Sequence, residues 1–149
     1  MGRKYYMAKV ISKNKDAFFN YEILDKFEAG IQLKGWEVKS IRAGKVNLKG
    51  AFCSFKGQEL YLSNMHINLY MSVPGDETSP RKLLLHKTQL RKMKEASKVK
   101  GHSIVATTLK WNSKGLVKVD IAIGKGKSKT DKRQTIKKRD DERMSKKYY

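Results

Sequence analysis

Hydrophobic and polar residues alternate in several segments of the chain, the pattern of half-buried β-strands. In "FFNYEILDKF" (residues 18–27), Phe19, Tyr21, Ile23 and Phe27 fall on one face. The alternation returns in "AFCSF" and in "ELYLSNMHINLY", which are separated by the turn sequence "KGQ". It returns again in "HSIVATTLKW" and "LVKVDIAIG", which flank the connection "NSKG" and are expected to form a hairpin.

Two segments have helical spacing instead. From Ala29 onward, one set of apolar residues spaced by three or four (Ala29, Leu33, Trp36) predicts a helix that ends near Gly44. This helix is expected to plug one end of a barrel, although Trp36–Glu37 as a partner-facing edge stays open as an alternative. The segment from about His86 is also expected to be helical, with one stripe formed by Leu90, Met93 and Ser97.

Many short strands with one or two helices predict a mainly β fold, a closed or nearly closed antiparallel barrel. The apolar residues concentrate in residues 1–123, which carry 23 basic and 10 acidic side chains, a net charge of +13. Residues 124–149 carry 11 basic and 4 acidic side chains and few large apolar groups. Such a segment buries too little surface to offset its ordering entropy, so it is expected to be a tail that is disordered when free.

The chain of 149 residues has a net charge of +20, with 34 Lys and Arg against 14 Asp and Glu. This excess makes a polyanion the expected partner, with nucleic acid favoured over an anionic membrane surface. No run of about 18 apolar residues is present to span a bilayer, and the N-terminus lacks the apolar core of a signal peptide. A single cysteine, Cys53, fits a reducing cytoplasm.

No pattern of catalytic, nucleotide-binding or metal-ligating residues emerges. "GKGKSKT" lacks the first glycine of a phosphate loop, because that position is Ile121. His66, His86 and His102 share no ligand spacing, and Cys53 is expected to be an inert core thiol. The protein is therefore expected not to be an enzyme and to need no cofactor or metal. A general RNA-binding or ribosomal protein remains as an alternative on charge alone. An RNA-processing enzyme that uses a histidine pair as base and acid is a further alternative.

The motifs, in order along the chain, resemble one known family. "FEAGIQLKGWEVKSIRAGKVNL", "RKLLLH", "VKVDIAIGKGK", and "DKR" followed by "IKKRD" are similar to the SsrA-binding protein family, also called small protein B. The resemblance covers residues 10–143, and the "EVKS" block and the "DKR" triplet are its most specific parts.

The resemblance implies an oligonucleotide-binding-type Greek-key barrel with flanking helices. It implies a cytoplasmic, monomeric protein that binds the tRNA-like domain of transfer-messenger RNA and delivers it to stalled ribosomes for trans-translation. The tail would become helical in the empty mRNA channel, against the 16S rRNA of the decoding centre. Alanyl-tRNA synthetase and elongation factor Tu would be met through the RNA.

The resemblance also implies a set of site residues. Asn14, Lys15, Glu28 and Leu84 match family positions, with Glu28 expected at the start of the helix. The full expected RNA-binding set is Asn14, Lys15, Glu28, Lys34, Lys39, Arg42, Lys45 and Leu84. The expected ribosome-binding set in the tail is Lys127, Asp131, Lys132, Arg133, Ile136, Lys137, Arg139 and Arg143.

The tail has the pattern of a one-sided basic helix. At about 100° per residue, six of its basic residues gather with Ile136 within roughly 100° of arc, which suits a channel lined by RNA. They are Lys129, Lys132, Arg139, Arg143, Lys146 and Lys147. Two places depart from the family pattern: "DAFFN" follows Lys15 where basic residues and a histidine are usual, and Thr130 precedes the "DKR" triplet.

Overall fold

The computed structural model describes residues 9–71 and 74–127. Within these residues the chain forms helices and strands in the following order: β1 (Lys9–Lys13), α1 (Lys15–Asn20), β2 (Tyr21–Ile31), α2 (Gly35–Arg42), β3 (Val46–Asn47), β4 (Phe52–Lys56), β5 (Glu59–Ser63), β6 (His66–Ile67), β7 (Arg81–Leu84), α3 (Lys87–Ser97), β8 (His102–Trp111) and β9 (Val117–Gly126).

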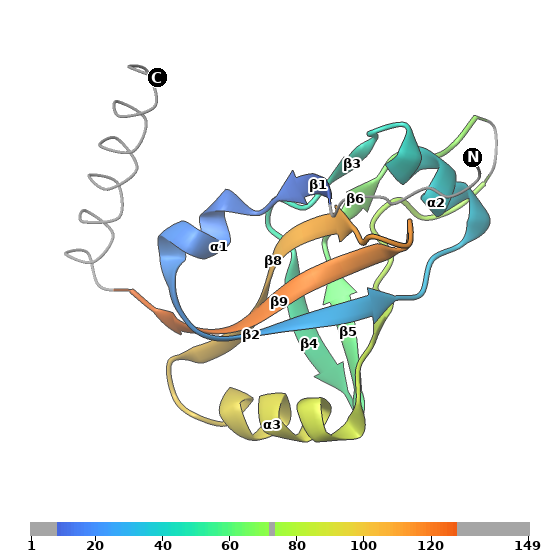
Figure 1. The fold of residues 1–149 in the computed structure, drawn as a ribbon. Helices are drawn as coiled ribbons and strands as arrows, with labels where there is room; N and C mark the ends of the chain where they lie inside the picture. Colours follow the sequence, from blue (N-terminus) through green and yellow to red (C-terminus); the bar gives the residue numbers. More distant parts are fainter. Residues whose placement is uncertain (1–8, 72–73, 128–149) are drawn as a thin grey trace, which may run out of the picture.

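One antiparallel sheet contains seven of the strands, in the order β1-β8-β4-β5-β7-β2-β9. Strand β8 also pairs with β9, and this second pairing closes the sheet into a ring, while β1 pairs with the Thr108–Trp111 part of β8 (Figure 1). Strands β3 and β6 form a separate short pair. The prediction of a mainly β, antiparallel fold with short helices is confirmed.

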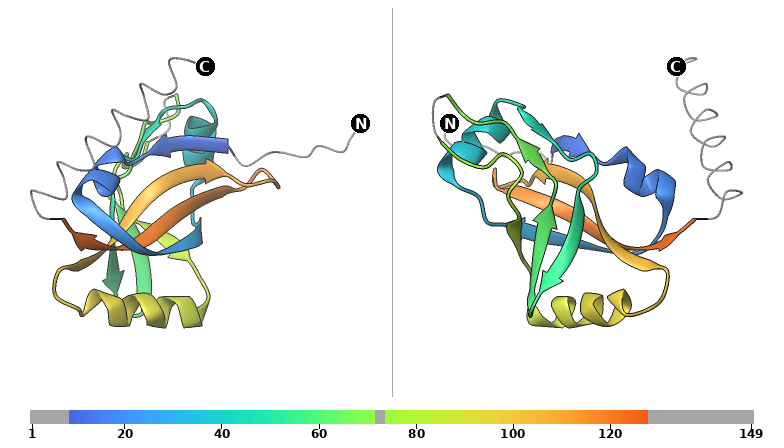
Figure 2. Two further views of the ribbon diagram at one scale, coloured as in Figure 1. Left: turned by 60° about the vertical axis from the view of Figure 1, so that its left-hand side comes forward. Right: turned by 180° about the vertical axis from the view of Figure 1, so that it is seen from behind.

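Aliphatic side chains from the strands fill the interior of the ring. Each such side chain contributes about 1.5–3 kcal/mol when it is fully removed from water. The completely buried strand residues of this core are Ala29, Leu60, Leu62, Ile67, Ala106, Leu109, Val119 and Ile121. Helix α3 lies across one end of the ring and buries Met93, while α2 lies toward the opposite end and buries Ile41 (Figures 1 and 2).

The predicted hairpin is present, and the two alternating segments around the "KGQ" turn also pair with each other. Strands β4 and β5 pair from Phe52–Ser63 to Lys56–Glu59 around a turn that contains Gly57. Strands β8 and β9 pair along nearly their whole length, and the side chain of Asn112 accepts hydrogen bonds from the amides of Lys114 and Leu116 in the loop between them. The helix expected from about His86 is also confirmed, but Ala96 rather than Ser97 packs on the core beside Leu90 and Met93.

The expected strand at residues 18–27 begins later than predicted. Residues 15–20 form the short helix α1, so Phe18 and Phe19 are helical, and the strand starts at Tyr21. Ala17 is buried against β8 and β9 residues Val105 and Ala122. This packing of α1 on the outside of the sheet overrides the alternation, because tertiary contacts outweigh local patterns in short elements.

The helix predicted from Ala29 is wrong over its first residues. Strand β2 continues through Ile31, with Gly30 opposite Leu84 of β7 and Lys118 of β9. Helix α2 begins only at Gly35. A glycine in the interior of a helix is destabilising relative to alanine, but Gly35 is the first residue of α2 and avoids this penalty. Gly44 follows the helix with a φ of 78°, which supports its expected role as the stop signal.

Candidate nucleic-acid interface

Glu28 lies on the outer face of β2, in register with Asp120 of β9. Both carboxylates hold the same lysine: Lys110 Nζ of β8 lies 2.9 Å from Glu28 Oε2 and 2.8 Å from Asp120 Oδ1. Hydrogen bonding to Asp120, and then to Glu28, raises the pKa of Lys110, so the ammonium stays charged. Glu28 is therefore a strand residue, contrary to the expected helix start, and Lys110 offsets one of the two negative charges of Glu28 and Asp120.

Leu84 lies on the same outer face. It ends β7 opposite Gly30, and a Cβ at Gly30 would lie 3.3 Å from Leu84 Cβ and 3.6 Å from Lys118 Nζ. Gly30 is two residues from Glu28 along β2, a separation of about 6.6 Å on the same face of a strand. Leu84 is 47% exposed and Glu28 50%, so both are open to a partner. We call Glu28, Leu84, Lys110, Lys118 and Asp120 the outer strand patch.

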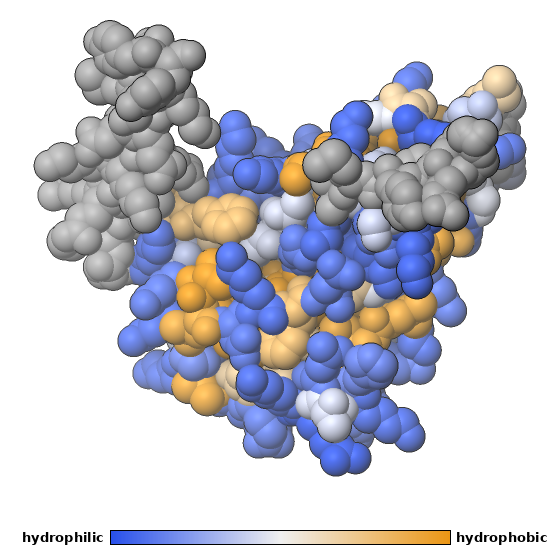
Figure 3. Space-filling model, viewed as in Figure 1, coloured by the Kyte–Doolittle hydropathy of each residue, from blue (hydrophilic) through white to orange (hydrophobic). Residues whose placement is uncertain are grey.

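Figure 3 shows the face drawn in Figure 1, where hydrophobic residues interrupt a mostly hydrophilic surface over the strands. Leu84 and Leu24 are among the exposed hydrophobic residues of the described chain. A mixed surface of this kind offers apolar contact for bases beside cations for phosphates.

Helix α2 carries most of the other expected RNA-binding cations. Lys34 caps its N-terminus, Lys39 and Arg42 lie in its last turn, and Lys45 follows it. All four side chains are exposed, and Lys39 Nζ lies 5.5 Å from the centre of the Tyr70 ring.

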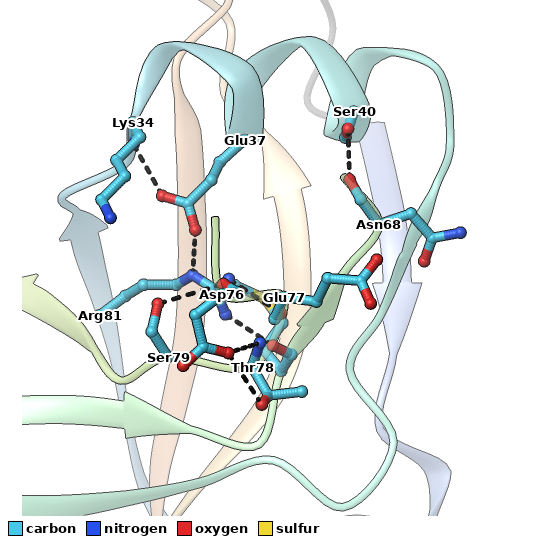
Figure 4. Close-up of polar contacts among 10 residues, drawn as sticks. Lys34, Glu37, Ser40, Asn68, Asp76, Glu77, Thr78, Ser79 and Arg81 are labelled. Carbon is cyan, nitrogen blue, oxygen red and sulfur yellow. Dashed lines mark hydrogen bonds and ion pairs between the residues drawn. The ribbon is translucent and has the colours of Figure 1, made fainter. Parts of the chain in front are cut away.

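The opposite side of α2 is bound to the rest of the protein by polar contacts (Figure 4). Glu37 Oε1 accepts a hydrogen bond from the Lys34 amide at 2.7 Å, and Oε2 pairs with Arg81 Nε at 2.5 Å. Ser40 Oγ donates to the Asn68 carbonyl at 2.6 Å. Trp36 lies against Gly75, where a Cβ would come within 2.8 Å of the indole ring. Since Trp36 and Glu37 are buried, the alternative of a partner-facing edge is wrong.

Asn14 is enclosed instead of lying at the surface. Only 3% of it is exposed, and its Nδ2 donates to the carbonyls of Ala51 at 3.1 Å and Ala106 at 3.0 Å. Its side chain thereby joins the β1–α1 junction to β8 and to the chain before β4. The expectation that Asn14 is a polar surface residue is wrong. Lys15, the next residue, is exposed at the start of α1.

The start of the tail is attached to α1. The Lys127 amide donates to the Asn20 carbonyl at 2.9 Å, and its Nζ donates to the Phe18 carbonyl at 3.1 Å. A lysine at a helix C-terminus satisfies open carbonyls and complements the helix dipole. The remaining tail residues of the expected ribosome-binding set, Asp131 to Arg143, lie outside the described residues.

Three patch residues escaped the sequence-based prediction: Lys110, Lys118 and Asp120. The hairpin register places Lys110 directly opposite Lys118, and the alternation of β9 puts Lys118 and Asp120 on one face. That much can be read from the two strands alone. Their proximity to Glu28 and Leu84 depends on the pairing of β2 with β9, which no local sequence pattern predicts.

The described residues hold no cluster suited to metal binding. Among residues 9–71 and 74–127, no three His, Cys, Asp or Glu side chains come together as metal ligands. Cys53 is buried in the core, and desolvation raises its pKa to about 12, so the thiol is inert as expected. In the same part of the chain, none of the helices is long and apolar enough to cross a membrane.

Fold and surface together define a small, strongly basic β-ring protein whose exposed cations and apolar side chains suit nucleic acid. The family model described as "SmpB protein" matches residues 11–149. The "SsrA-binding protein" of Mycoplasmopsis pulmonis is 56% identical over 141 residues, which cover 95% of this chain and 97% of that protein. The chain belongs to the SmpB protein family.

More distant sequences agree with this assignment. The "SsrA-binding protein" of Cytophaga hutchinsonii is 45% identical over 146 residues, covering 96% of this chain and 95% of that protein. A solved structure described as "tmRNA-SmpB: a journey to the center of the bacterial ribosome" is 40% identical, with a TM-score of 0.65. The match covers 83% of this chain and 92% of that one.

Proposed function

We propose that this protein binds the tRNA-like domain of transfer-messenger RNA and delivers it to stalled ribosomes for trans-translation. The observation that carries the proposal is the 56% identity to an SsrA-binding protein over 97% of that protein's length. The match to the SmpB family model over residues 11–149 supports a non-enzymatic RNA-binding protein. The protein acts as a monomer in the cytoplasm, where the ribosomes are.

The closed antiparallel ring is an oligonucleotide-binding-type Greek-key barrel. The closure of β8 on both β4 and β9 supports this description, as does the helix across one end of the ring. In this fold class, nucleic acid binds the strand surface through stacking and phosphate contacts. The outer strand patch and the α2 cations are the RNA-binding surfaces. Lys15 extends them on α1.

Within the outer strand patch, each residue has a role suited to its chemistry. Lys118 neutralises phosphate, and Leu84 contacts a base or ribose. Glu28 accepts hydrogen bonds from base amino groups or a 2′-hydroxyl, which an unbalanced carboxylate near phosphate could not do favourably. Lys110 partly offsets this charge, since it lies between Glu28 and Asp120.

The tail, residues 124–149 in the sequence-based division, is proposed to enter the mRNA channel and contact the 16S rRNA of the decoding centre. The basic residues around Ile136 support this assignment through their one-sided spacing. Lys127 differs from the rest of the set, because its amino group is already bound to α1. Alanyl-tRNA synthetase and elongation factor Tu act on the same RNA and are met through it.

A general RNA-binding role is the competing function, and the +20 charge alone would favour it. The two functions are separated by isolating the protein from bacterial cells at about 150 mM salt and sequencing the RNA that accompanies it. Strong enrichment of transfer-messenger RNA over its cellular abundance is expected. RNA in proportion to its abundance, mostly ribosomal, would contradict the proposal.

A further inference from the structure

A buried ion pair joins helix α2 to the start of β7. A helix of eight residues is too short to be stable by itself, so its direction depends on tertiary contacts. Of its four buried residues, two are the polar Glu37 and Ser40. Both reach the segments that lead to and from the loop between β6 and β7.

Arg81 is the centre of this connection (Figure 4). It is 3% exposed, and it donates through Nε to Glu37, through Nη1 to the Met65 carbonyl at 2.6 Å and through Nη2 to the Glu77 carbonyl at 3.0 Å. The three acceptors belong to α2, to the residue before β6 and to the segment before β7. One guanidinium therefore fixes three parts of the chain relative to each other.

Glu37 completes the arrangement with its second oxygen. It is 2% exposed, and it holds the Lys34 amide with Oε1 while Oε2 holds Arg81. The carboxylate thus determines where the helix begins and how it is rotated. The cations on the free side of α2, Lys34, Lys39 and Arg42, are placed by the same two bonds.

We propose that Glu37 and Arg81 are positioning residues for RNA binding: their buried pair holds α2 so that its exposed cations meet successive phosphates. The proposal rests on the proposed function and extends it to residues that cannot touch RNA themselves. Phosphate contacts set the register of a bound RNA. A rotated or loosened α2 would therefore cost affinity even though every cation were still present.

The test replaces the pair in the full-length protein by Glu37→Met with Arg81→Met. Exchanging a buried ion pair for apolar side chains often leaves stability unchanged, and the net charge stays the same. Binding of the tRNA-like domain of transfer-messenger RNA is measured from 50 to 300 mM salt, at a temperature where circular dichroism shows full folding. We expect roughly tenfold weaker binding and a slope of log affinity against log salt that is smaller by about 1–2.

The matched control is Glu95→Gln with Lys98→Met. It also removes one acidic and one basic residue, but this pair is exposed, spans 3.2 Å and lies at the end of α3, away from α2. Its affinity and salt slope should equal those of the unchanged protein. If the Glu37/Arg81 variant also binds with unchanged affinity and slope, α2 needs no positioning and the inference is wrong.

A milder change keeps the test decisive if the double variant does not fold. Arg81→Lys retains a charge beside Glu37 but replaces the planar fork with a single ammonium group, which cannot reproduce its geometry. An intermediate loss of salt slope is expected, and an unchanged slope would overturn the inference. Failure of the proposed function looks different: the unchanged protein would then bind unrelated structured RNA as tightly as transfer-messenger RNA, whatever the variants do.

Discussion

The side-chain amide of Asn14 is enclosed where β1 gives way to α1, and both of its hydrogen atoms are used by carbonyls. Glu28 is half-exposed on a strand and shares Lys110 with Asp120. A change at a buried hydrogen-bonded group leaves partners without bonds, whereas a change at an exposed group mainly alters what the surface can bind.

Asn14→Ala should destabilise the protein by about 2–4 kcal/mol, because two buried carbonyls lose their donors and a small cavity remains. Chemical denaturation monitored by circular dichroism measures the loss. RNA affinity should fall only under conditions where unfolded protein is present. A variant as stable as the unchanged protein would show that the hydrogen bonds of the Asn14 side chain contribute nothing to stability.

Glu28→Ala provides the exposed counterpart. Its midpoint of denaturation should change little, since an exposed ion pair contributes about 0–1 kcal/mol. Affinity for the tRNA-like RNA should nevertheless fall by about 1–3 kcal/mol through the lost hydrogen bond to RNA, as measured by gel shift. Unchanged affinity would remove Glu28 from the interface.

Among the strands, β9 is paired on both edges and has little room for a side chain at Gly124. It pairs with β2 on one side and β8 on the other, and it continues to Gly126, beyond the point where the sequence changes character. At Gly124, a Cβ would lie 2.8 Å from Tyr21 Cβ. That atom is attached directly to the backbone and cannot move aside. The close pairing of β9 with the start of β2 therefore requires a glycine at this position.

Gly124→Ala should therefore lower stability by about 1–3 kcal/mol, the usual cost of overpacking. Gly126→Ala is the matched control, because a Cβ at Gly126 meets nothing within 4 Å. Thermal denaturation of both variants tests the difference. Equal melting temperatures would mean that β2 and β9 can move apart at Gly124 with little loss of stability.

For the whole molecule, the expected division of labour lies between a folded body and a basic tail. The structure adds a practical point about where to separate them. Residues 124–126 belong to β9, and Lys127 donates hydrogen bonds to two backbone carbonyls of α1. A truncation after Ile123 would remove part of the sheet, so the informative truncation follows Lys127.

A chain that ends at Lys127 should fold and keep most of its affinity for the isolated tRNA-like RNA, because the RNA-binding surfaces remain. Tagging of nascent chains in a reconstituted translation system should be lost, since no tail remains for the mRNA channel. Lys132→Ala with Arg133→Ala should reproduce the loss of tagging in the full-length chain. If truncation abolishes RNA binding and tagging equally, the tail belongs to the RNA-binding surface.

Much of this protein is determined by local sequence. Alternation locates the β4–β5 and β8–β9 hairpins, and three- and four-residue spacing locates α3, because each pattern reports the face that one element buries. The excess of Lys and Arg predicts a polyanionic partner, since charge acts regardless of fold. The motif order is enough to indicate the family.

The tertiary structure alone decided the rest. Spacing alone predicted a helix from Ala29, yet pairing with β7 and β9 keeps Gly30 and Ile31 in a strand. Asn14 is an exposed polar residue by type, but the carbonyls that enclose it come from residues 37 and 92 positions away. Hydrogen bonds between distant segments leave no periodic trace in the sequence, and they determine which polar side chains hold the fold and which remain free for RNA.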